Sequence, residues 1–535
     1  MSEVPRVTIA GGGLAGLTAA LRLAERGYRV KLYEQKPMLG GDLASRPAAD
    51  GVELDVYPHM YLSWYHNFWR LLGDATDVDR GKLFRPVKSV KQLGRGDFPR
   101  FSAVTDVTSA WSMFRDVFSG VAPPADMFLY AYASIDLLAE RLNPTMSLDD
   151  VSVNGFLNAR PYMTKRAAEI SNSFITRVWA IPSYLTAADD YRSYIEYSLA
   201  EPTSTFRLAR GPASRQVIQP LTAALEAAGV EILRSVEVTT VSCTDGRVNE
   251  IRLKDAAGEK WTEEIDELIL AVPEYALSSL VRTGGRGKRI VESSPRLAEV
   301  SRLRAQPIPI VHVYFTRKLP RIPVEPVGLL DSRLALAFTD ISQTWDGVTE
   351  FAGRTVLSLS ASDPYGLPGT GRHDDAFAML HELAEYLPFD PGKNWGKSSD
   401  IDWDRTRYEP NTDAQLFVNE TGTDVWRPGA ACDGISNLYF AGDFCANRIG
   451  MTTIESAVTT GLEAARVIVE RRGIGKPVEI TEPDAGDGAL YVWLRYAWAP
   501  YAATAKAWSA GSDCFGSLRD ILTPARPPAR QRRDS

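Results

Sequence analysis

The chain has few of the residues from which disulfide frameworks and metal clusters are built. It contains only four cysteines and five histidines among 535 residues, and no C-x-x-C motif. Cys243, Cys432, Cys445 and Cys514 are far apart except for the 432/445 pair, which indicates free thiols in a reducing cytosol. The histidines are scattered, so we expect no bound metal.

Long apolar runs and an excess of positive charge are also missing. No run of about 18 uncharged apolar residues occurs, which is the length that indicates a transmembrane helix. Because an apolar strand already starts at Val7, we expect no signal peptide and a cytoplasmic protein. The 60 basic and 67 acidic residues give a net charge of −7, which argues against a nucleic-acid partner.

What the chain does have is an ordinary globular composition and a marked pattern near its start. In the segment from Val7 to Glu34, an apolar run is followed by glycines in G-x-G-x-x-G spacing, Gly11, Gly13 and Gly16. Apolar residues then recur at helical spacing, and a second apolar run ends at Glu34. This order predicts a strand, a glycine turn, a helix and a second strand of one βαβ unit.

Each part of this unit fits a dinucleotide. Gly13 has no side chain to keep a pyrophosphate from the backbone, and Gly16 allows close packing of helix and strand. The helix N-terminus at Leu14 and Ala15 offers unpaired N–H groups and a positive dipole end to phosphates. Glu34 is placed to accept the ribose hydroxyls and to repel a 2′-phosphate, which argues against NADP.

The residues after Glu34 carry a resemblance to a known family. Gln35, Lys36, Gly40 and Gly41 resemble the E-x-[RK]-x-x-x-G-G segment of flavoproteins in the amine oxidase and carotenoid desaturase superfamily. The family's usual arginine after the glycine pair is Asp42 here. The resemblance implies FAD as cofactor, bound by these residues. It also implies an α/β fold with a Rossmann-like FAD-binding domain interleaved with an α+β substrate-binding domain.

A second segment with the same resemblance lies far along the chain, from Asn437 to Val467. It resembles the A-G-D-[FY]…[ST]-M-E-G-A-V-x-S-G segment that closes the flavin site in plant-type desaturases. The resemblance implies that Gly442 and Asp443 bind the cofactor, with Asp443 accepting from ribityl hydroxyls or ordering water on the phosphates. It further implies that the N–H groups at Thr453 and Ile454 face the flavin, where they stabilise negative charge on the reduced ring.

The aromatic segment from residue 51 to 73 resembles the G-x-H-x-x-x-G-x-Y-x-N segment of phytoene and ζ-carotene desaturases and hydroxysqualene dehydroxylases. In those enzymes the segment runs beside the flavin ring. His59 is therefore interpreted either as a catalytic pocket residue or as a core histidine bonded to the backbone. We expect a substrate pocket formed by Tyr57, Tyr61 and Tyr65, with Met451 from the later segment. Tyr57 replaces a family glycine, which indicates a reshaped pocket.

Three further segments extend the resemblance through the middle of the chain. The stretch from Gly211 to Val241 implies a helix that opens at Gln219-Pro220, and Val238 as the adenine contact. An Asp-Gly turn predicts a β-hairpin over 241–248. Residues 307–315 predict a strand, with 334–338 and 356–360 as partners. In this strand Ile310 takes the place of the lysine of amine oxidases, which argues against amine oxidation.

These segments predict three parts of the chain. The FAD-binding domain is formed by 1–84, 206–296 and 426–475. The substrate domain is formed by 85–205, expected to be mostly helical with helices over 110–118, 127–142 and 167–178 and a cap at 147–150, and by the β-rich segment 297–425. Residues 476–535 form a separate aromatic helix and a basic disordered tail. Residues 364–372 are glycine-rich and are expected to form a surface turn.

The aromatic tail allows two interpretations. Ala489 to Trp508 contains three tryptophans and three tyrosines but also charges and a proline, so it is too polar to span a bilayer. It fits a helix at a membrane interface, with the arginine-rich end attracted to anionic lipid on the inner face of the membrane. The alternative is a helix that packs on its own core, with a solvated end.

The resemblance implies an FAD-dependent oxidoreductase that removes hydride from a lipophilic, isoprenoid or carotenoid-like substrate. Oxygen, a quinone or another electron acceptor would reoxidise the flavin. The alternatives are an amine or amino-acid oxidase that releases hydrogen peroxide, a non-redox flavin-dependent isomerase, and a scaffold that only retains the nucleotide fold.

Overall fold

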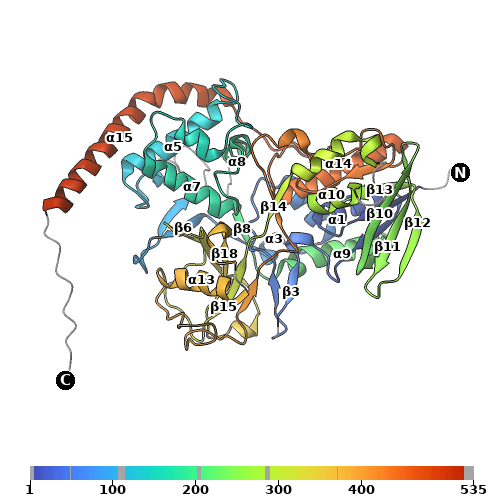
Figure 1. The fold of residues 1–535 in the computed structure, drawn as a ribbon, viewed down its shortest axis with the longest axis horizontal. Helices are drawn as coiled ribbons and strands as arrows, with labels where there is room; N and C mark the ends of the chain where they lie inside the picture. The colour runs from blue at the N-terminus through green and yellow to red at the C-terminus, as the bar shows by residue number, and fades with distance from the viewer. Residues whose placement is uncertain are drawn as a thin grey trace.

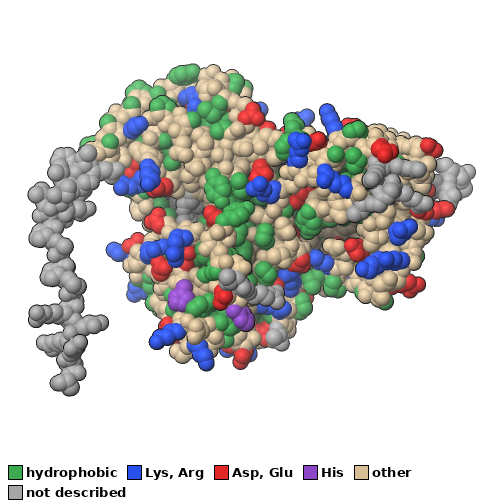
Figure 2. Space-filling model, viewed as in Figure 1, with side chains coloured by type: hydrophobic (Ala, Val, Ile, Leu, Met, Phe, Trp, Pro, Cys, Tyr) green, Lys and Arg blue, Asp and Glu red, His purple; other side chains and the backbone are tan. Residues whose placement is uncertain are grey.

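The computed structural model describes residues 5–48, 50–105, 115–201, 206–282, 290–369 and 372–522. Figure 1 shows a nucleotide-binding part around α1 and α14, a sheet around β15 and β18, and a group of helices around α5, α7 and α8. In Figure 2, positive and negative side chains are interspersed over this face, with no large area of one sign.

The first sheet is parallel and has five strands within the described ranges, in the order β21-β13-β1-β2-β9. Their bounds are β1 (Arg6–Ala10), β2 (Arg29–Glu34), β9 (Glu231–Arg234), β13 (Glu267–Leu270) and β21 (Leu438–Phe440). The helices α1 (Leu14–Ala24), α9 (Gln219–Ala227) and α14 (Ile454–Arg472) contact one another or the sheet. The predicted strand–turn–helix–strand unit is therefore confirmed, and so is the later strand and helix.

The two helices that begin beside the glycine motifs are packed together tightly. A Cβ atom on Gly461 of α14 would lie 2.4 Å from the Ala15 carbonyl oxygen of α1. Only glycine permits this approach, because real Cβ atoms do not come so close to another heavy atom. The first and last segments of the nucleotide-binding part are thus fixed against each other.

The predicted hairpin is present and longer than expected. It consists of β10 (Val236–Thr244) and β11 (Arg247–Asp255), and β12 (Lys260–Glu264) adds a third antiparallel strand. At its turn, Asp245 and Gly246 both have positive φ, 51° and 69°, as a tight Asp-Gly turn requires. Val238 lies in β10, next to a register shift.

A seven-stranded mixed sheet, counted over the described chain, has the order β19-β15-β18-β17-β16-β6-β7. Its strands are β6 (Ser89–Leu93), β7 (Ser102–Thr105), β15 (Ile310–Tyr314), β16 (Val327–Leu329), β17 (Leu336–Asp340), β18 (Val356–Ala361) and β19 (Arg407–Glu409). The strand predicted over 356–360 does pair with β15. The strand predicted over 334–338 pairs with β18 and not with β15, so that part of the prediction was wrong.

The helical part is shorter than predicted, because residues 84–105 form strands. Its helices include α5 (Pro124–Ala139), α6 (Val153–Asn158), α7 (Lys165–Trp179) and α8 (Ala188–Ala200). The helices predicted over 127–142 and 167–178 correspond to α5 and α7, whereas the one over 110–118 lies partly outside the described residues. The predicted cap at 147–150 is wrong, since Ser152 caps α6 by accepting from the Gly155 N–H at 3.0 Å.

The other elements connect these parts. The remaining helices are α2 (His66–Ala75), α3 (Arg80–Leu83), α10 (Glu274–Arg282), α12 (Ile341–Thr344), α13 (Arg372–Ala384) and α15 (Gly488–Leu522). The short strands are β3 (Ser45–Pro47), β4 (Glu53–Asp55), β5 (Phe84–Val87), β8 (Phe206–Ala209), β14 (Arg304–Gln306) and β20 (Leu416–Val418). Short helical turns cover 41–43, 214–218, 295–302, 349–351, 364–366 and 424–426.

The predicted segments agree with the sheets, although the domain boundaries themselves stay predictions. All strands of the parallel sheet fall in 1–84, 206–296 and 426–475, and all strands of the seven-stranded sheet fall in 85–205 and 297–425. Cys243, Cys432 and Cys445 are buried free thiols, and Cys514 and the basic tail over 523–535 lie where side chains are not described. Within the described residues, no helix has the length and hydropathy needed to cross a bilayer.

Candidate cofactor and substrate site

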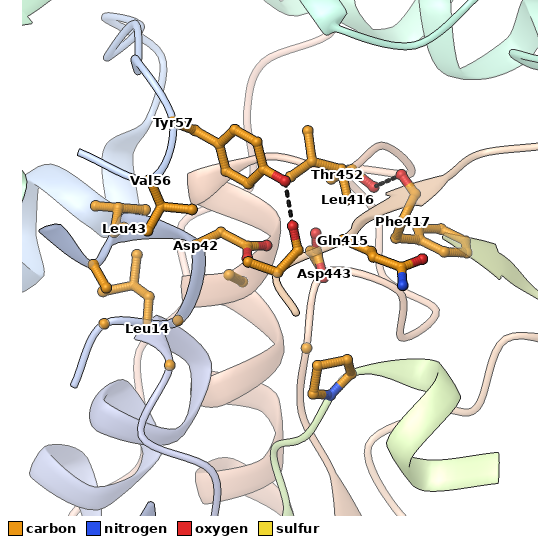
Figure 3. A pocket seen from close by; sticks show the side chains of 18 of the residues that line it. Leu14, Asp42, Leu43, Val56, Tyr57, Gln415, Leu416, Phe417, Asp443 and Thr452 are labelled. Atoms are coloured by element: carbon orange, nitrogen blue, oxygen red, sulfur yellow. Dashed lines mark hydrogen bonds between the residues drawn. The ribbon is translucent and has the colours of Figure 1, made fainter. Parts of the chain in front are cut away.

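A large cavity runs from the glycine turn of β1 and α1 to the face of the seven-stranded sheet. Its volume is about 730 Å³, within the range of roughly 300–1,000 Å³ typical of small-molecule and cofactor sites. Both ends of the chain's nucleotide-binding part line it, together with strands of the second sheet. Figure 3 shows side chains from segments far apart in the sequence meeting around it.

The glycine turn lies against one wall of the cavity. Gly11 has φ +111°, and its N–H donates to the Tyr33 carbonyl oxygen at 2.8 Å. A Cβ atom on Gly16 would lie 2.0 Å from the Gly11 oxygen, so Gly16 provides the close helix packing that its spacing predicts. Gly13 differs, because a Cβ atom there would meet only the Gly41 Cα atom, at 3.9 Å. The two glycine segments are joined by the Gly40 N–H, which donates to the Gly12 carbonyl oxygen at 2.8 Å. The missing side chain of Gly13 leaves open space beside it, so that a pyrophosphate can approach the backbone from the cavity.

Glu34 links this turn to the segment that follows it. Its carboxylate accepts from the Gly12 N–H at 2.7 Å and from the Lys36 N–H at 2.8 Å. Burial raises the pKa of Glu34, and these N–H groups oppose the rise. The Lys36 ammonium group donates to the Asp413 carboxylate at 3.0 Å, and Glu34 itself lines the cavity.

The opposite wall is formed by the loop after β21 and the N-terminus of α14. Thr453 caps this helix by accepting from the Ser456 N–H at 3.0 Å. Ser456, which replaces a family glycine, donates to the Asp443 carbonyl oxygen at 3.3 Å. The serine therefore ties the loop to the helix while the N-terminal residues Thr453 and Ile454 line the cavity. Two helix N-termini, those of α1 and α14, are directed at the same space, an arrangement that favours anions.

A buried arginine that sequence reasoning missed shapes this loop. The Arg427 guanidinium donates to the carbonyl oxygens of Phe444, at 2.9 Å, and Cys445, also at 2.9 Å. It also donates to the carbonyl oxygens of Asp443 and Gly450. Its five donors match several carbonyls at once, which a lysine could not do. No sequence motif predicts the role of Arg427, because it binds backbone carbonyl groups, which every residue has.

Three acids line the cavity where the family's arginine is absent. Burial and the neighbouring Asp443 carboxylate raise the pKa of Asp42 to about 7. Burial raises the pKa of Asp443 to about 6, and the pKa of Glu274 to about 8. Figure 3 shows the Asp42 and Asp443 side chains directed toward the same central part of the cavity. This part of the site therefore changes its charge near neutral pH.

The other end of the cavity is apolar. The lining residues from 180–194 and 308–360 include no Asp, Glu, Lys or Arg: they are Ala180, Tyr194, Ile308, Ile310, Pro326, Ala337, Phe338, Thr339, Ser358 and Ser360. The substrate part contributes one charged lining residue, Asp413, from the loop before β20. Tyr57 also lines this part, and its hydroxyl donates to the Ala414 carbonyl oxygen, a hydrogen bond drawn in Figure 3. The tyrosine is thereby fixed, and the wall presents mostly carbon to the cavity.

His59 lies in this apolar part. Burial lowers the pKa of His59 to about 4, and an interaction with the Tyr57 backbone partly opposes the shift. The ring is therefore neutral at physiological pH. Its Nδ1 atom is buried and has no hydrogen-bond partner within the described structure. The ring lies in the cavity wall and also interacts with the backbone, so the catalytic role of His59 stays a prediction.

Most of the residues expected in the site line the cavity. They are Gly11, Gly13, Leu14, Ala15, Glu34, Gln35, Lys36, Gly40, Gly41, Asp42, Tyr57, His59, Tyr65, Val238, Gly442, Asp443, Thr453 and Ile454. Tyr61 does not line it, because its ring packs among Phe68 and Phe84, 5.5 and 4.7 Å away between centroids. Met451 also does not line it, because it is buried in the core, while the next residue, Thr452, faces the cavity.

Sequence reasoning also missed Glu455, the residue that holds α2 in place through its contact with Asn67 and Phe68. Glu455 of α14 is fully buried and accepts from the N–H groups of Asn67, at 2.8 Å, and Phe68, at 2.9 Å. The Asn67 side chain donates to the same carboxylate at 2.8 Å. Asn67 matches the family segment, but here it acts as a structural partner of Glu455. Burial raises the pKa of Glu455 to about 7.

The fold and this site define a class of protein, and comparisons with known proteins agree with it. The profile of the flavin-containing amine oxidoreductases matches residues 14–469. The chain therefore belongs to this family, and it is an FAD-dependent oxidoreductase. The gap beside Gly13, the Glu34 carboxylate and the two helix N-termini fit FAD. When bound there, FAD supplies the capacity to accept a hydride from a substrate C–H bond.

The chain is also similar to individual proteins of known name. The chain is 36% identical over 497 residues to a zeta-carotene desaturase of Synechocystis sp., covering 87% of this chain and 97% of that protein. It is 26% identical over 513 residues to a carotenoid phi-ring synthase of Streptomyces griseus, covering 91% and 92%. Among solved structures, cyclohexylamine oxidase of Brevibacterium oxydans has a TM-score of 0.61 at 13% identity, covering 88% and 100%. The likeness to that structure shows the shared fold.

Proposed function

We propose that this protein desaturates an apolar, isoprenoid or carotenoid-like substrate with FAD as the oxidant. One hydride and one proton leave adjacent carbons, and a new C=C bond forms between them. Oxygen, a quinone or another carrier then takes up the two electrons. The zeta-carotene desaturase and carotenoid phi-ring synthase among the relatives support a polyene substrate.

The apolar wall of the cavity is the observation that carries this proposal. The strands β15, β17 and β18 and the segments around them contribute only uncharged side chains to the cavity. A protonated amine would lose its hydration there without gaining a charged partner, which is costly. A hydrocarbon has no hydrogen bonds with water to lose, and removal of its apolar surface from water stabilises the bound state. The cavity therefore discriminates in favour of hydrocarbon.

Ile310 gives a second argument against the amine oxidase alternative. It lies at the start of β15, lines the cavity and is fully buried. The only lysine among the residues that line the cavity is Lys36, and its ammonium group is paired with Asp413. No lysine is thus available at the substrate end, within the described residues, to position water for amine oxidation.

Because FAD is the oxidant, the protein's own residues have only to bind and orient the substrate, exclude water and accept a proton. The apolar walls exclude water and align a C–H bond with the flavin end of the cavity. Tyr57, fixed by its bond to Ala414, sets the shape of the pocket next to the aspartates. His59, neutral and unpaired at Nδ1, can receive the proton that leaves the substrate.

The proposal is tested with FAD-loaded protein and polyenes of increasing conjugation dispersed in detergent. Under anaerobic conditions the expected result is bleaching of the flavin absorbance with a product two mass units lighter and absorbing at longer wavelength. Amines and amino acids should give neither flavin bleaching nor hydrogen peroxide. Peroxide formation with amines and no reaction with polyenes would refute the proposal, and turnover without flavin reduction would indicate the isomerase.

A charge placed in the apolar wall provides a matched comparison. Thr339 lines the cavity from β17, whereas Thr349 is exposed on a short turn. Thr339→Asp should abolish polyene turnover while FAD stays bound, because the carboxylate brings water into the hydrocarbon site. Thr349→Asp should leave turnover unchanged. Equal activity of both variants would show that the wall does not bind substrate.

A further inference from the structure

The helix α15 has two faces of different character, and only one of them is used by the fold. Its inner face packs on α5, with Arg495 paired to Asp136 and Glu140. Arg495 also donates to the Asn143 carbonyl oxygen at 2.9 Å, and Trp498 stacks on Phe128 with centroids 5.8 Å apart. Figure 1 shows α15 along the outer edge of the helical part. The helix is thus held firmly in place from one side.

The outer face of α15 is a stripe of exposed apolar and aromatic side chains. Trp493, Tyr501 and Trp508 are 64%, 66% and 75% exposed, and Leu490 is 51% exposed. With the spacing 490, 493, 501 and 508, these side chains point in nearly the same direction around a helix of 3.6 residues per turn. The stripe is about 27 Å long, from the rise of about 1.5 Å per residue. A helix packed only on its own core would not expose its largest aromatic side chains.

The charged residues near the stripe indicate the kind of surface that can bind it. Between 488 and 511 the only charged residues are Arg495, which is buried, and Lys506, which donates to the Pro161 carbonyl oxygen. No acidic side chain lies on this length of the helix. The sequence from 512 to 535 contains five arginines and three aspartates, and four of the arginines lie in the last ten residues. An apolar, aromatic face without acids, continued by a basic end, is complementary to an anionic lipid surface.

The structure assigns to the outer face of α15 the role of a docking surface for a lipid bilayer, with the aromatic stripe lying in the interface plane. Tryptophan and tyrosine favour the level of the lipid headgroups, where the ring is apolar and its N–H or O–H group meets water. The inner-face contacts of Arg495, Trp498 and Ser509, whose hydroxyl donates to Asp126 at 2.8 Å, keep the stripe oriented outward. Docking then holds the enzyme on the membrane without any segment that crosses it.

The orientation of the docked helix follows from the residues at its two ends. Glu482, Asp484 and Asp487 directly precede the helix, and anionic lipid repels them. Residues 512–535, at and beyond its far end, carry five arginines against three aspartates and are therefore net basic. The helix therefore lies with its C-terminal half, which contains Tyr501 and Trp508, closest to the bilayer.

The test uses the full-length, FAD-loaded protein without substrate, so that it is independent of the desaturase proposal. Flotation is measured with vesicles of phosphatidylcholine alone and of phosphatidylcholine mixed with phosphatidylglycerol. The unsubstituted protein should float with both and more strongly with the mixture. The triple variant Trp493→Ser, Tyr501→Ser and Trp508→Ser should bind about a thousandfold more weakly, because each inserted aromatic contributes roughly a factor of ten.

A matched control removes three exposed apolar side chains elsewhere. Val78, Tyr365 and Val425 are also exposed but lie away from α15. The triple variant with serine at these positions should float as the unsubstituted protein does. FAD content and thermal melting show that both triple variants are folded, which we expect since the replaced side chains are exposed.

Three results would overturn the assignment. The first is failure of the unsubstituted protein to float with either vesicle type, and the second is equal flotation of the two triple variants. The third is self-association, in which the stripe pairs with a second copy of the chain. Light scattering would then show a dimer that the α15 variant alone dissociates, together with no binding to vesicles.

Discussion

Replacing Asp42 by asparagine should remove a pH dependence from FAD binding. Asp42 stands where the family segment that it resembles has arginine, and burial together with the Asp443 carboxylate raises its pKa to about 7. Below this pH the carboxyl group is mostly neutral, and above it a negative charge stands in the cavity. FAD carries negative phosphates, so it should bind more tightly to the protonated form, and its affinity should fall as the pH rises.

The size of the effect follows from proton linkage. When binding takes up one proton, the dissociation constant rises by up to about tenfold for each pH unit above the pKa. Asp443 and Glu274, whose pKa values are about 6 and about 8, titrate in the same cavity and add to the slope of the unsubstituted protein. Asp42→Asn removes the contribution of Asp42 to the slope of log Kd against pH. The slope at pH 8 should therefore be shallower by up to about one logarithmic unit per pH unit.

The measurement is FAD binding to the apoprotein, followed by flavin fluorescence between pH 6 and 9. Asp413→Asn is the matched control. Asp413 lines the same cavity, but the hydrogen bonds and charges of Lys36 and Arg46 outweigh its burial and lower its pKa, so it stays ionised over this range. Its variant should retain the full slope.

Two outcomes would refute the reasoning about Asp42. If Asp42→Asn and the unsubstituted protein show the same slope, the carboxyl group does not titrate on binding. If Asp42→Asn binds FAD more weakly at every pH, the ionised carboxylate is a direct ligand of the cofactor, for example of its hydroxyl groups. In either case the substitution of the family arginine would have a different explanation.

Other substitutions test the remaining parts of the site. Gly16→Ala should abolish FAD retention, because its Cβ atom would lie 2.0 Å from the Gly11 oxygen, whereas Gly73→Ala has open space and should be silent in the same flavin assay. Glu455→Ala should destabilise the protein by about 2–4 kcal/mol in denaturant unfolding, since it leaves the N–H groups at the start of α2 without their buried acceptor; unchanged stability would contradict this role. His59→Gln should lower kcat about a hundredfold with FAD content unchanged. His59→Gln should leave the shape of the kcat profile between pH 6 and 8 unchanged, because burial lowers the pKa of His59 to about 4 and inflections in that range belong to the acids of the cavity.

The parts of the site that could be predicted are those with a local signature. The turn at Gly11 and Gly16 and the strand and helix around Asp443 are contiguous segments in which each residue type has a steric or electrostatic task. Such patterns survive in the sequence because no distant partner is needed to recognise them. The same holds for the Asp-Gly hairpin turn, whose positive φ angles select those two residues.

What could not be predicted depends on partners distant in the chain. The strand β6 joins the second sheet by parallel pairing of Lys91 with Val327, and no local periodicity reveals a partner so far away. Arg427 binds backbone carbonyl groups, which leave no trace in sequence. The error at Tyr61 has a related cause: in an aromatic segment, the pattern does not tell which rings face a cavity and which pack on Phe84.

The tight crossing of α1 and α14 at Gly461 has a consequence for how the protein is made. The two helices that direct their N-termini at the cofactor are separated by more than 400 residues, and the edge strand β21 also belongs to the last part of the chain. A nascent chain on the ribosome that has reached only β13 has the glycine turn but neither the second helix nor the edge strand. Cofactor loading must therefore follow synthesis of nearly the whole protein, and until then the exposed edge of β13 depends on rapid completion or on chaperones.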